Sequence, residues 1–292
     1  MSTWTAAIRE WIYYCCASRA GAARSFPGSL MSSSRSDSPQ LPRSLIAAAL
    51  LVASGAFAIG AQQVPEPWPQ HSMSRPRPPI ETAPPQRLPV PAPAGALVLF
   101  DGRDLAWWEQ SDGRPAAWRL VGDGAMEVTT GGGIQTRASF GDVMAHVEWA
   151  SPATIEGEGQ DRGNSGVFLM GKYEVQVLDS YRNETYADGQ AGAIFGQFPP
   201  RVNVSRKPGE WQSYDIEFNR PRFSETGALV SPARMTVRHN GVLIHDDAAL
   251  IGPTTFGVHA PYEAHADALP IALQDHGHAV LFRNIWVKPL PR

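Results

Sequence analysis

The stretch RGNSGVFLMGKYEVQVLDS, residues Arg162–Ser180, decides the fold class. Two apolar-rich runs lie on either side of the pair Gly171-Lys172, which is typical of a tight turn. In the second run apolar residues alternate with Glu174 and Gln176, and a period of two places alternate side chains on opposite faces of a strand. The stretch therefore predicts a β-hairpin with one apolar face and one polar face.

Short runs of the same kind recur from residue 97 to the C-terminus, separated by Gly, Pro, Asn and Asp, and none has a helical period. The pair Asn240-Gly241 predicts a two-residue hairpin, because both positions tolerate a positive φ. This spacing predicts an all-β sandwich. The expected strands are Leu97–Phe100, Trp118–Val121, Ala125–Thr129, Gly133–Thr136, Val143–Trp149, Gly166–Met170, Tyr173–Leu178, Ala193–Phe195, Trp211–Phe218, Arg234–His239, Val242–His245, Ile271–Gln274 and Val280–Val287.

Several of these strands pair an apolar face with a face of titratable and amide side chains. In Val143–Trp149, for example, His146 and Glu148 point away from the apolar residues. Solvated surface strands ordinarily show this pattern. A curved sandwich also uses such a face to bind sugars, so the pattern leaves both interpretations open.

The first 95 residues are predicted to contain a targeting signal followed by a spacer. The apolar run Leu45–Gly60 follows basic residues and ends in small ones, which predicts a secretory signal within residues 1–61, with Met31 as the true start. We expect export to the periplasm or the cell exterior. The alternative is an uncleaved signal that gives transient membrane association. Residues 62–95 carry eleven prolines between Val64 and Gly95 and predict a Pro-rich linker before a domain at 96–292.

Composition excludes two classes of protein. The formal net charge of −3 argues against a nucleic-acid partner, which calls for a basic surface. The two cysteines, Cys15 and Cys16, are adjacent, so a disulfide scaffold is excluded. No feature of the sequence identifies a protein partner.

Glu174, Gln176 and Asp179 form the most informative polar pattern. Glu174 and Gln176 share a face at a backbone separation of about 7 Å, and two carboxyl groups at such a spacing can act as acid and base around a glycosidic bond. The pattern Glu-x-Gln-x-x-Asp resembles the Glu-x-Asp-x-x-Glu strand of jelly-roll β-glucanases. Gln176 stands where the second acid belongs, which speaks against ordinary two-carboxylate displacement.

A second group of candidates lies near the C-terminus. His276 follows Asp275 in a Gly turn and is suited to carry a proton near neutral pH. The alternative is that Asp275 caps the turn and His276 is simply exposed. Arg283 lies among apolar residues, so we expect it to pair with Asp179 or Glu174. No zinc motif is present, and a divalent cation held by oxygen ligands stays an open possibility.

Several motifs, in order, resemble the 3-keto-disaccharide hydrolase domain. The resemblance covers about Leu97 to Arg292. It implies a concanavalin-like jelly roll of two antiparallel sheets and an exported enzyme acting on 3-keto-glucosides or 3-keto-disaccharides. The motifs are LFDGRDLAWWE (Leu99–Glu109), NSGVFLMGKYEVQVLDS (Asn164–Ser180), GAIFGQFPP (Gly192–Pro200), GEWQSYDIEF (Gly209–Phe218), NGVLIHD (Asn240–Asp246) and LQDHGHAVLFRNIWVKPL (Leu273–Leu290).

The resemblance implies a particular chemistry. A keto group at C3 acidifies the C2 hydrogen, so a base can remove it, the C1 substituent can leave, and water can add back. Such a site needs a base, an acid for the leaving oxygen and a group that stabilises the enolate.

Each candidate residue then receives an expected role. Glu174 and His276 are the acid and base, and Asp179 orients His276 or Arg283. The remaining residues are expected to bind the sugar: Asn164, Gln176, Arg283, Glu148, His146 and Trp108. Trp107 and Trp108 together could form a plane on which the sugar stacks; the alternative is that they pack in the core. The alternatives are a non-catalytic carbohydrate-binding module of the same fold and a structural or adhesive surface domain.

Overall fold

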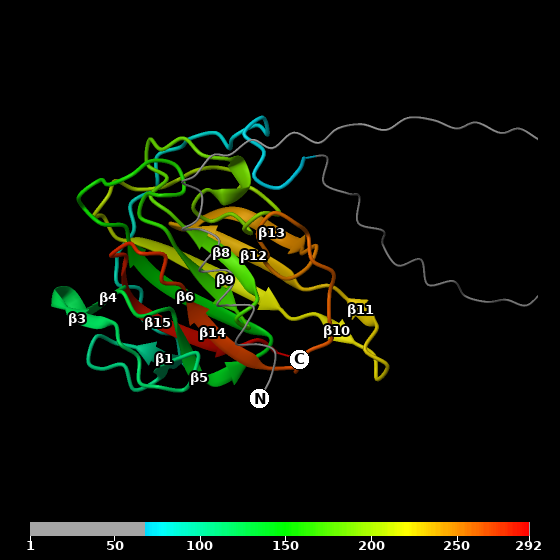
Figure 1. Ribbon diagram of the computed structural model, residues 1–292. Coiled ribbons are helices and arrows are strands. Elements are labelled where there is room, and N and C mark those ends of the chain that lie inside the picture. The colour runs from blue at the N-terminus through cyan, green and yellow to red at the C-terminus, as the bar shows by residue number, and fades with distance from the viewer. Residues whose placement is uncertain (1–67, 292) are drawn as a thin grey trace, which may run out of the picture.

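The computed structural model describes residues 68–291, which form fifteen short strands and two single turns of 3-10 helix (Figure 1). The expected signal segment and the start at Met31 fall outside the described residues. Within residues 68–291, no helix has the length and apolar character needed to cross a membrane. The strands build two antiparallel sheets packed face to face, as expected for a jelly-roll sandwich.

The large sheet has eight strands, and all of its pairings are antiparallel. Seven strands lie in one continuous order, and β1 pairs with β15 beside that path. The order is β13 (Val242–Ala249), β12 (Arg234–His239), β9 (Gln212–Asn219), β6 (Val143–Ala150), β15 (Leu281–Pro289), β4 (Ala125–Glu127) and β3 (Arg119–Val121), with β1 spanning Leu97–Phe100.

The small sheet has five strands, in the order β2 (Trp108–Gln110), β5 (Ile134–Phe140), β14 (Leu269–Leu273), β7 (Ser165–Leu169) and β8 (Tyr173–Val177). A separate pair, β10 (Arg222–Phe223) and β11 (Leu229–Ser231), stands apart from both sheets. The 3-10 turns are η1 (Gly122–Gly124) and η2 (Ala187–Gly189).

The core lies between the two sheets and is filled by the apolar side of each alternating strand. From β6 the buried side chains include Val147 and Trp149, and from β8 they include Val175 and Val177. The rings of Tyr173 and Phe218 meet across the sandwich with their centres 5.4 Å apart. The period-two pattern therefore identified which side of each of these strands is buried.

Two hairpins lie where the sequence predicts turns. Asn240 and Gly241 both have positive φ, 51° and 80°, in the turn between β12 and β13. Between β7 and β8 the positive-φ residues are Met170 and Gly171, one position earlier than the expected Gly171-Lys172 pair. The expected strand Ala193–Phe195 forms only isolated bridges through Ile194.

Trp108 is a correction to the expected sugar-binding set. Its side chain is completely buried, and its indole N–H donates to the carbonyl of Leu99 at 3.0 Å. It packs in the core because it sits on the inward side of β2, whereas Trp107 just before the strand is 40% exposed.

Residues 68–94, here called the strap, differ from the expected free linker because they pack against the sandwich. The backbone of Asn203 bonds to Pro79 and Glu81 in the strap, and Arg206 donates to the carbonyl of Pro84. Proline removes N–H donors, so the strap cannot join a sheet as a regular strand. Its remaining N–H groups and its carbonyls bond instead to groups on the sandwich.

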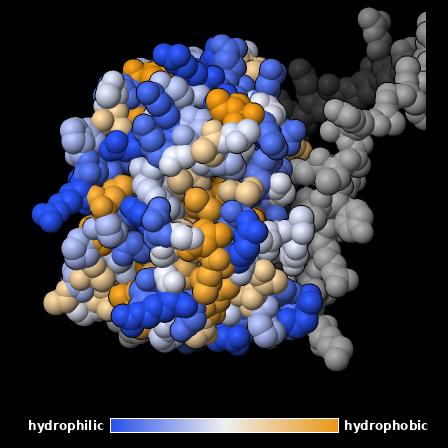
Figure 2. Space-filling view, turned by 90° about the vertical axis from the view of Figure 1, so that its left-hand side faces the viewer, coloured by the Kyte–Doolittle hydropathy of each residue, from blue (hydrophilic) through white to orange (hydrophobic). Residues whose placement is uncertain are grey.

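The edge of the large sheet remains open beside β3 and β1. Leu120 of β3 is 43% exposed and Val98 of β1 is 39% exposed. The corresponding side of the molecule shows apolar residues gathered among hydrophilic ones (Figure 2). Scattered apolar exposure of this size is ordinary for a sandwich edge.

Candidate functional site

The sequence-predicted site residues divide between the outer faces of two different sheets. His146, Glu148 and Arg283 lie on the large sheet, on strands β6 and β15. Glu174 and Gln176 lie on β8 of the small sheet. The alternation of polar residues along a strand does not reveal which sheet the strand joins. The polar residues expected on one face therefore lie on two.

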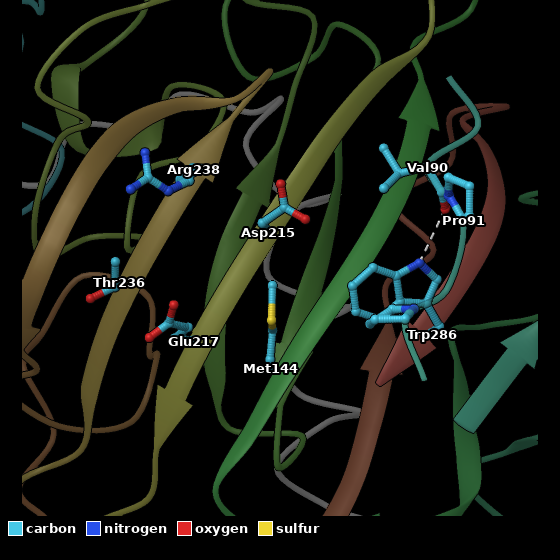
Figure 3. A pocket seen from close by; sticks show the side chains of 9 residues that line it. Val90, Pro91, Met144, Asp215, Glu217, Thr236, Arg238 and Trp286 are labelled. Carbon is cyan, nitrogen blue, oxygen red and sulfur yellow. Dashed lines mark hydrogen bonds between the residues drawn. The ribbon is translucent and has the colours of Figure 1, made fainter. Parts of the chain in front are cut away.

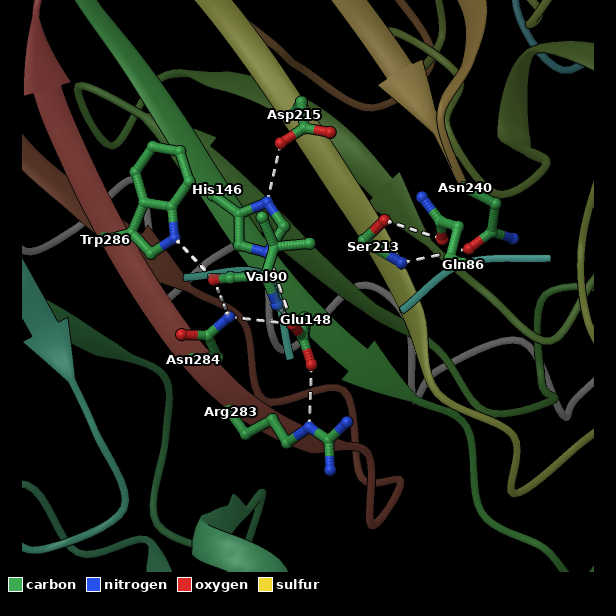
Figure 4. A network of polar contacts seen from close by, with 10 residues as sticks. All are labelled: Gln86, Val90, His146, Glu148, Ser213, Asp215, Asn240, Arg283, Asn284 and Trp286. Carbon is green, nitrogen blue, oxygen red and sulfur yellow. Dashed lines mark hydrogen bonds and ion pairs between the residues drawn. The ribbon is translucent and has the colours of Figure 1, made fainter. Parts of the chain in front are cut away.

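On the large sheet, His146 and Glu148 form a buried ionic network (Figure 4). His146 Nδ1 lies 2.6 Å from Asp215 Oδ1, and its Nε2 lies 3.5 Å from Glu148 Oε1. Burial opposes the charged imidazole, but the hydrogen bonds to Asp215 and Glu148 raise the pKa of His146 above its ordinary value. Burial likewise opposes ionised Glu148, and its hydrogen bonds outweigh that effect and lower its pKa.

Arg283 belongs to this network, which corrects the expected pairing with Asp179 or Glu174. Its Nε donates to Glu148 Oε2 at 2.8 Å, and its guanidinium stacks over the Trp211 ring at 4.0 Å. The register of β15 against β6 places Arg283 directly opposite Glu148, which explains the pairing.

The strap lies across this network and supplies hydrogen-bond partners to its side chains. The N–H of Val90 donates to Glu148 Oε1 at 2.7 Å, and its carbonyl accepts from Asn284 at 2.8 Å and from Trp286 at 3.4 Å. Gln86 of the strap accepts a hydrogen bond from Ser213 (Figure 4). Both oxygens of Glu148 are thus occupied by the protein itself, and the network anchors the strap.

A shallow cavity of about 290 Å³ remains beside Val90 on this face (Figure 3). Strap residues form one wall, and side chains of the large sheet form the rest, among them Met144, Asp215, Glu217, Arg238 and Trp286. Trp286 already stacks on His146, with ring centres 4.9 Å apart, so its ring is not a free platform.

The outer face of the small sheet carries a different polar group, in which Glu174 and Gln176 lie beside a glycine. Ladder partners place Ala272, Phe168 and Glu174 in one row across β14, β7 and β8. The neighbouring row contains Gly166 opposite Gln176. A Cβ on Gly166 would collide with Glu174 Oε1, so the carboxyl group leans over the glycine.

Glu174 is the chemically unusual residue of this face. It is only 1% exposed, and its Oε2 has no hydrogen-bond partner among residues 68–291. Burial raises the pKa of Glu174 well above its ordinary value of 4.5, which favours the protonated carboxyl group. In one orientation of its amide, Gln176 donates to Glu174 Oε1 at 3.2 Å; in the other it donates to Gln160 Oε1 at 3.0 Å.

Further amide side chains lie in the loops that surround Gln176. Gln160 Nε2 donates to the carbonyl of Gly189 at 2.9 Å, and Asn164 Nδ2 donates to the carbonyl of Gln160 at 2.8 Å. Several buried polar atoms around these residues have no partner in the described chain: Asn164 Oδ1, Glu174 Oε2, Asp188 Oδ1, Gln190 Oε1, His71 Nε2 and Gln70 Oε1. Buried polar groups are almost always paired, so this cluster is a candidate place for a ligand or water to bind, here called the pocket.

His276 lies in the loop after β14. Gln274, which directly follows β14, donates its N–H to the carbonyl of Gly166. Its ring stacks on His278, with centres 5.9 Å apart, and His278 Nε2 lies 3.5 Å from Asp161, the neighbour of Gln160. Burial, together with nearby His278, lowers the pKa of His276, which leaves its ring neutral at neutral pH.

Asp179 does not orient His276 or Arg283, which corrects its expected role. One oxygen accepts from Arg162 Nε at 2.7 Å, and the other accepts from the N–H of Tyr181 at 3.1 Å. Asp275 accepts N–H bonds from Gly132 and Gly277 and thus caps its turn, as the alternative interpretation holds. Asp179 and Asp275 therefore shape the loops beside the pocket.

Sequence reasoning missed Gln160, Asp188 and the strap residue His71. They lie in segments without periodicity, and only the fold pairs Gln160 with Gln176 and His71 with Asp188. Within residues 68–291 no three His, Cys, Asp or Glu side chains are grouped to hold a metal ion.

Comparison with known proteins places this geometry in context. Residues 95–288 match the family described as the 3-keto-alpha-glucoside-1,2-lyase-like domain, and strap residues 68–94 precede the match. A comparison with curated proteins gave no match.

Solved structures also resemble the chain. One, described as a candidate glycosyl hydrolase of Parabacteroides distasonis, is 45% identical, covers 68% of this chain and 85% of that chain, and has a TM-score of 0.65. A second structure so described, from the same organism, is 18% identical, covers 68% and 94%, and has a TM-score of 0.47. A Bacillus licheniformis β-glucanase is 12% identical, covers 68% and 99%, and has a TM-score of 0.37.

Proposed function

Because the chain belongs to the 3-keto-alpha-glucoside-1,2-lyase-like family, we propose that it cleaves the glycosidic bond of 3-keto-glucosides over the outer face of the small sheet. Membership of this family makes the protein carbohydrate-active in character. One observation carries the proposal to this face: a buried Glu174 with an unpartnered oxygen lies among amide oxygens that also lack partners in the described chain.

The proposed reaction begins with proton removal from C2 of the sugar. The ketone at C3 acidifies this proton, and a base accepts it. The C2–H electron pair forms a C1=C2 double bond while the C1–O bond breaks, and the departing oxygen takes a proton. The products are an unsaturated keto sugar and the free alcohol. Addition of water, with hydroxyl at C1 and a proton at C2, completes a net hydrolysis.

The two titratable groups of the pocket are suited to opposite roles. The raised pKa of Glu174 favours its protonated form, which would give its proton to the departing oxygen. His276 is neutral at the same pH and would accept the C2 proton. Opposite shifts of two pKa values in one site are a common basis for assigning an acid and a base.

The amides would bind the uncharged parts of the sugar. Asn164 Oδ1 and Gln190 Oε1 can accept hydrogen bonds from hydroxyls. The N–H groups of Gln176 can donate to the enolate oxygen that develops at C3. This arrangement needs no second carboxylate beside Glu174, and Gln176 is compatible with it.

The test measures release of 3-keto-glucose by the full chain from 3-keto-glucosides, with the unoxidised glycosides alongside and with or without EDTA. We expect cleavage of the keto substrates alone, and loss of about 10²–10⁴-fold in turnover for Glu174→Gln and for His276→Gln. Glu109→Gln, on β2 at the far side of the same sheet, is the matched control and should retain activity. Sensitivity to EDTA would point to a divalent cation. Binding of the sugars without turnover would favour a carbohydrate-binding module instead.

Export remains part of the proposal. The apolar run Leu45–Gly60 with its preceding arginines supports secretion to the periplasm or beyond. Amino-terminal sequencing of the protein from a fractionated bacterial host tests this, with cleavage near Ala61 expected and an intact cytoplasmic chain contradicting it.

A further inference from the structure

A second cavity, of about 430 Å³, lies where the strap crosses two loops of the sandwich, and is here called the strap cavity. Its walls come from strap residues 80–83, from residues 180–182 shortly after β8, and from residues 203–210 before β9. None of the residues assigned to the proposed cleavage lines it, so it is a separate site. Small-molecule sites have volumes of roughly 300–1,000 Å³, so this cavity has room for a small organic molecule.

Asn203 holds the three walls of the strap cavity together, and its side chain is buried. Its backbone N–H donates to the carbonyl of Pro79 at 2.8 Å, and its own carbonyl accepts from the N–H of Glu81 at 3.0 Å. Its side-chain Nδ2 donates to the carbonyl of Ser180 at 3.0 Å, and its Oδ1 accepts from the N–H of Ser205 at 2.9 Å. The cavity is therefore built by specific hydrogen bonds and is not a gap left by loose packing.

The lining of the strap cavity carries unpaired charge. Arg182, Arg206 and Lys207 bring three positive charges, and Glu81 and Glu210 bring two negative ones. Within residues 68–291 none of these five side chains forms an ion pair. The lining is therefore positive on balance, and a cleft lined by an excess of one charge attracts ligands of the opposite charge.

Two of these cations are held in place, one on each loop. Arg206 Nη2 donates to the carbonyl of Pro84 at 2.7 Å, and the guanidinium of Arg182 lies over the Tyr181 ring, 5.4 Å from its centre. Arg206 Nε is buried and has no acceptor in the described part of the chain. A planar guanidinium matches the paired oxygens of a carboxylate or a phosphate. An oxyanion beside Arg206 would supply the missing acceptor.

We propose that the strap cavity binds a sugar that carries an oxyanion, either a carboxylate or a phosphate. Arg182 and Arg206 bind the oxyanion, and Lys207 adds to the positive potential around it. The hydroxyl of Thr82, on the exposed side of the cavity, can exchange hydrogen bonds with sugar hydroxyls. Membership of a carbohydrate-active family favours a sugar over other organic acids. The proposal goes beyond the cleavage reaction and does not depend on it.

The test is calorimetric binding of four compounds to the full chain: glucuronate, glucose 6-phosphate, glucose and inorganic phosphate. The variants are Arg182→Gln and Arg206→Gln. The matched control is Arg201→Gln, which removes the same charge from an exposed side chain that does not line the cavity. Thermal unfolding shows whether each variant has folded. Arg206 also fastens the strap through Pro84, whereas Arg182 contacts Tyr181, so Arg182→Gln tests the site even if Arg206→Gln fails to fold.

We expect at least one of the two acidic sugars to bind and glucose to show no measurable binding. The compound that binds more tightly identifies the oxyanion as carboxylate or phosphate. Arg182→Gln and Arg206→Gln should each weaken this binding about tenfold or more, as for the loss of hydrogen bonds to a charged group. Arg201→Gln should leave it unchanged. Glu81→Gln should tighten it by roughly two- to fivefold, because a negative charge is removed from the lining.

The proposal is overturned if neither acidic sugar binds, if glucose binds equally well, or if binding is indifferent to both Arg182→Gln and Arg206→Gln. Inorganic phosphate that binds as tightly as glucose 6-phosphate would also overturn it, because the cavity would then hold an adventitious ion only. Cleavage of keto-glucosides is measured with other compounds and other variants. Failure of either proposal therefore leaves the other intact.

Discussion

Glu174 is a carboxyl group that the fold has withdrawn from water without giving it a cation. Its folded-state pKa lies well above the ordinary 4.5, so ionisation is disfavoured in the folded protein. The free energy of unfolding should then fall as the pH rises above about 4.5, until the folded-state pKa has been passed.

Glu174→Gln should remove this pH dependence while it abolishes turnover. We expect the variant to be as stable as the wild type near pH 5 and more stable at pH 9, because the neutral amide never has to ionise. Urea unfolding at both pH values measures the difference. A variant that is less stable at every pH would mean that the carboxyl group has a structural role.

His146 also has a raised folded-state pKa, but for a different reason: burial opposes its charged form, and hydrogen bonds to acidic partners more than offset this effect. Its folded-state pKa is raised above 6.5, so its contribution to stability is complete below about pH 6.5 and is lost as the pH rises through the folded-state pKa. His146→Gln should flatten the stability curve above pH 6.5. Asp215→Asn, which removes the 2.6 Å partner, should flatten it similarly. Urea midpoints between pH 6 and pH 9 that fall in parallel for wild type and variants would contradict this.

At the scale of the element, η2 packs closely against the Tyr186 ring and the amide of Gln160. Gly189→Ala should disturb this packing, because the added methyl group would collide with the ring and would lie 2.9 Å from Gln160 Nε2. We expect the variant to be less stable by about 1–3 kcal/mol and to lose activity, since the glycine is buried and its neighbours must shift. Gly122→Ala in η1, where a Cβ meets nothing within 4 Å, is the control. Steady-state kinetics and thermal unfolding of both variants decide the outcome.

The strands themselves were largely predictable from the sequence. Alternation in Val143–Trp149 and the Asn240-Gly241 turn identified strands and a hairpin, because these signals depend on neighbouring residues. The assignment of strands to sheets was not predictable. His146 and Glu174 have the same local pattern and lie on different sheets. The sequence likewise suggested Asp179 or Glu174 as the ion-pair partner of Arg283. Only the register of β15 shows that the partner is Glu148.

At the scale of the whole molecule, the strap covers the Glu148 network on the large sheet. Its composition predicted a spacer, because prolines contribute no strand pattern, and many of its contacts are with residues distant in the sequence. Val90→Pro removes the N–H that Glu148 accepts and leaves the sheet unaltered. We expect the strap to loosen and trypsin to cleave faster after the exposed Arg87. Cleavage within the sandwich serves as the internal reference, and an unchanged rate at Arg87 would show that Glu148 does not hold the strap.

The position of the strap has a consequence for any form of the protein trimmed to residues 95–288. Glu148 would lose the N–H of Val90, and Asn284 and Trp286 would lose the carbonyl of Val90. Trimming would therefore open to water an ionic network that the full chain keeps covered.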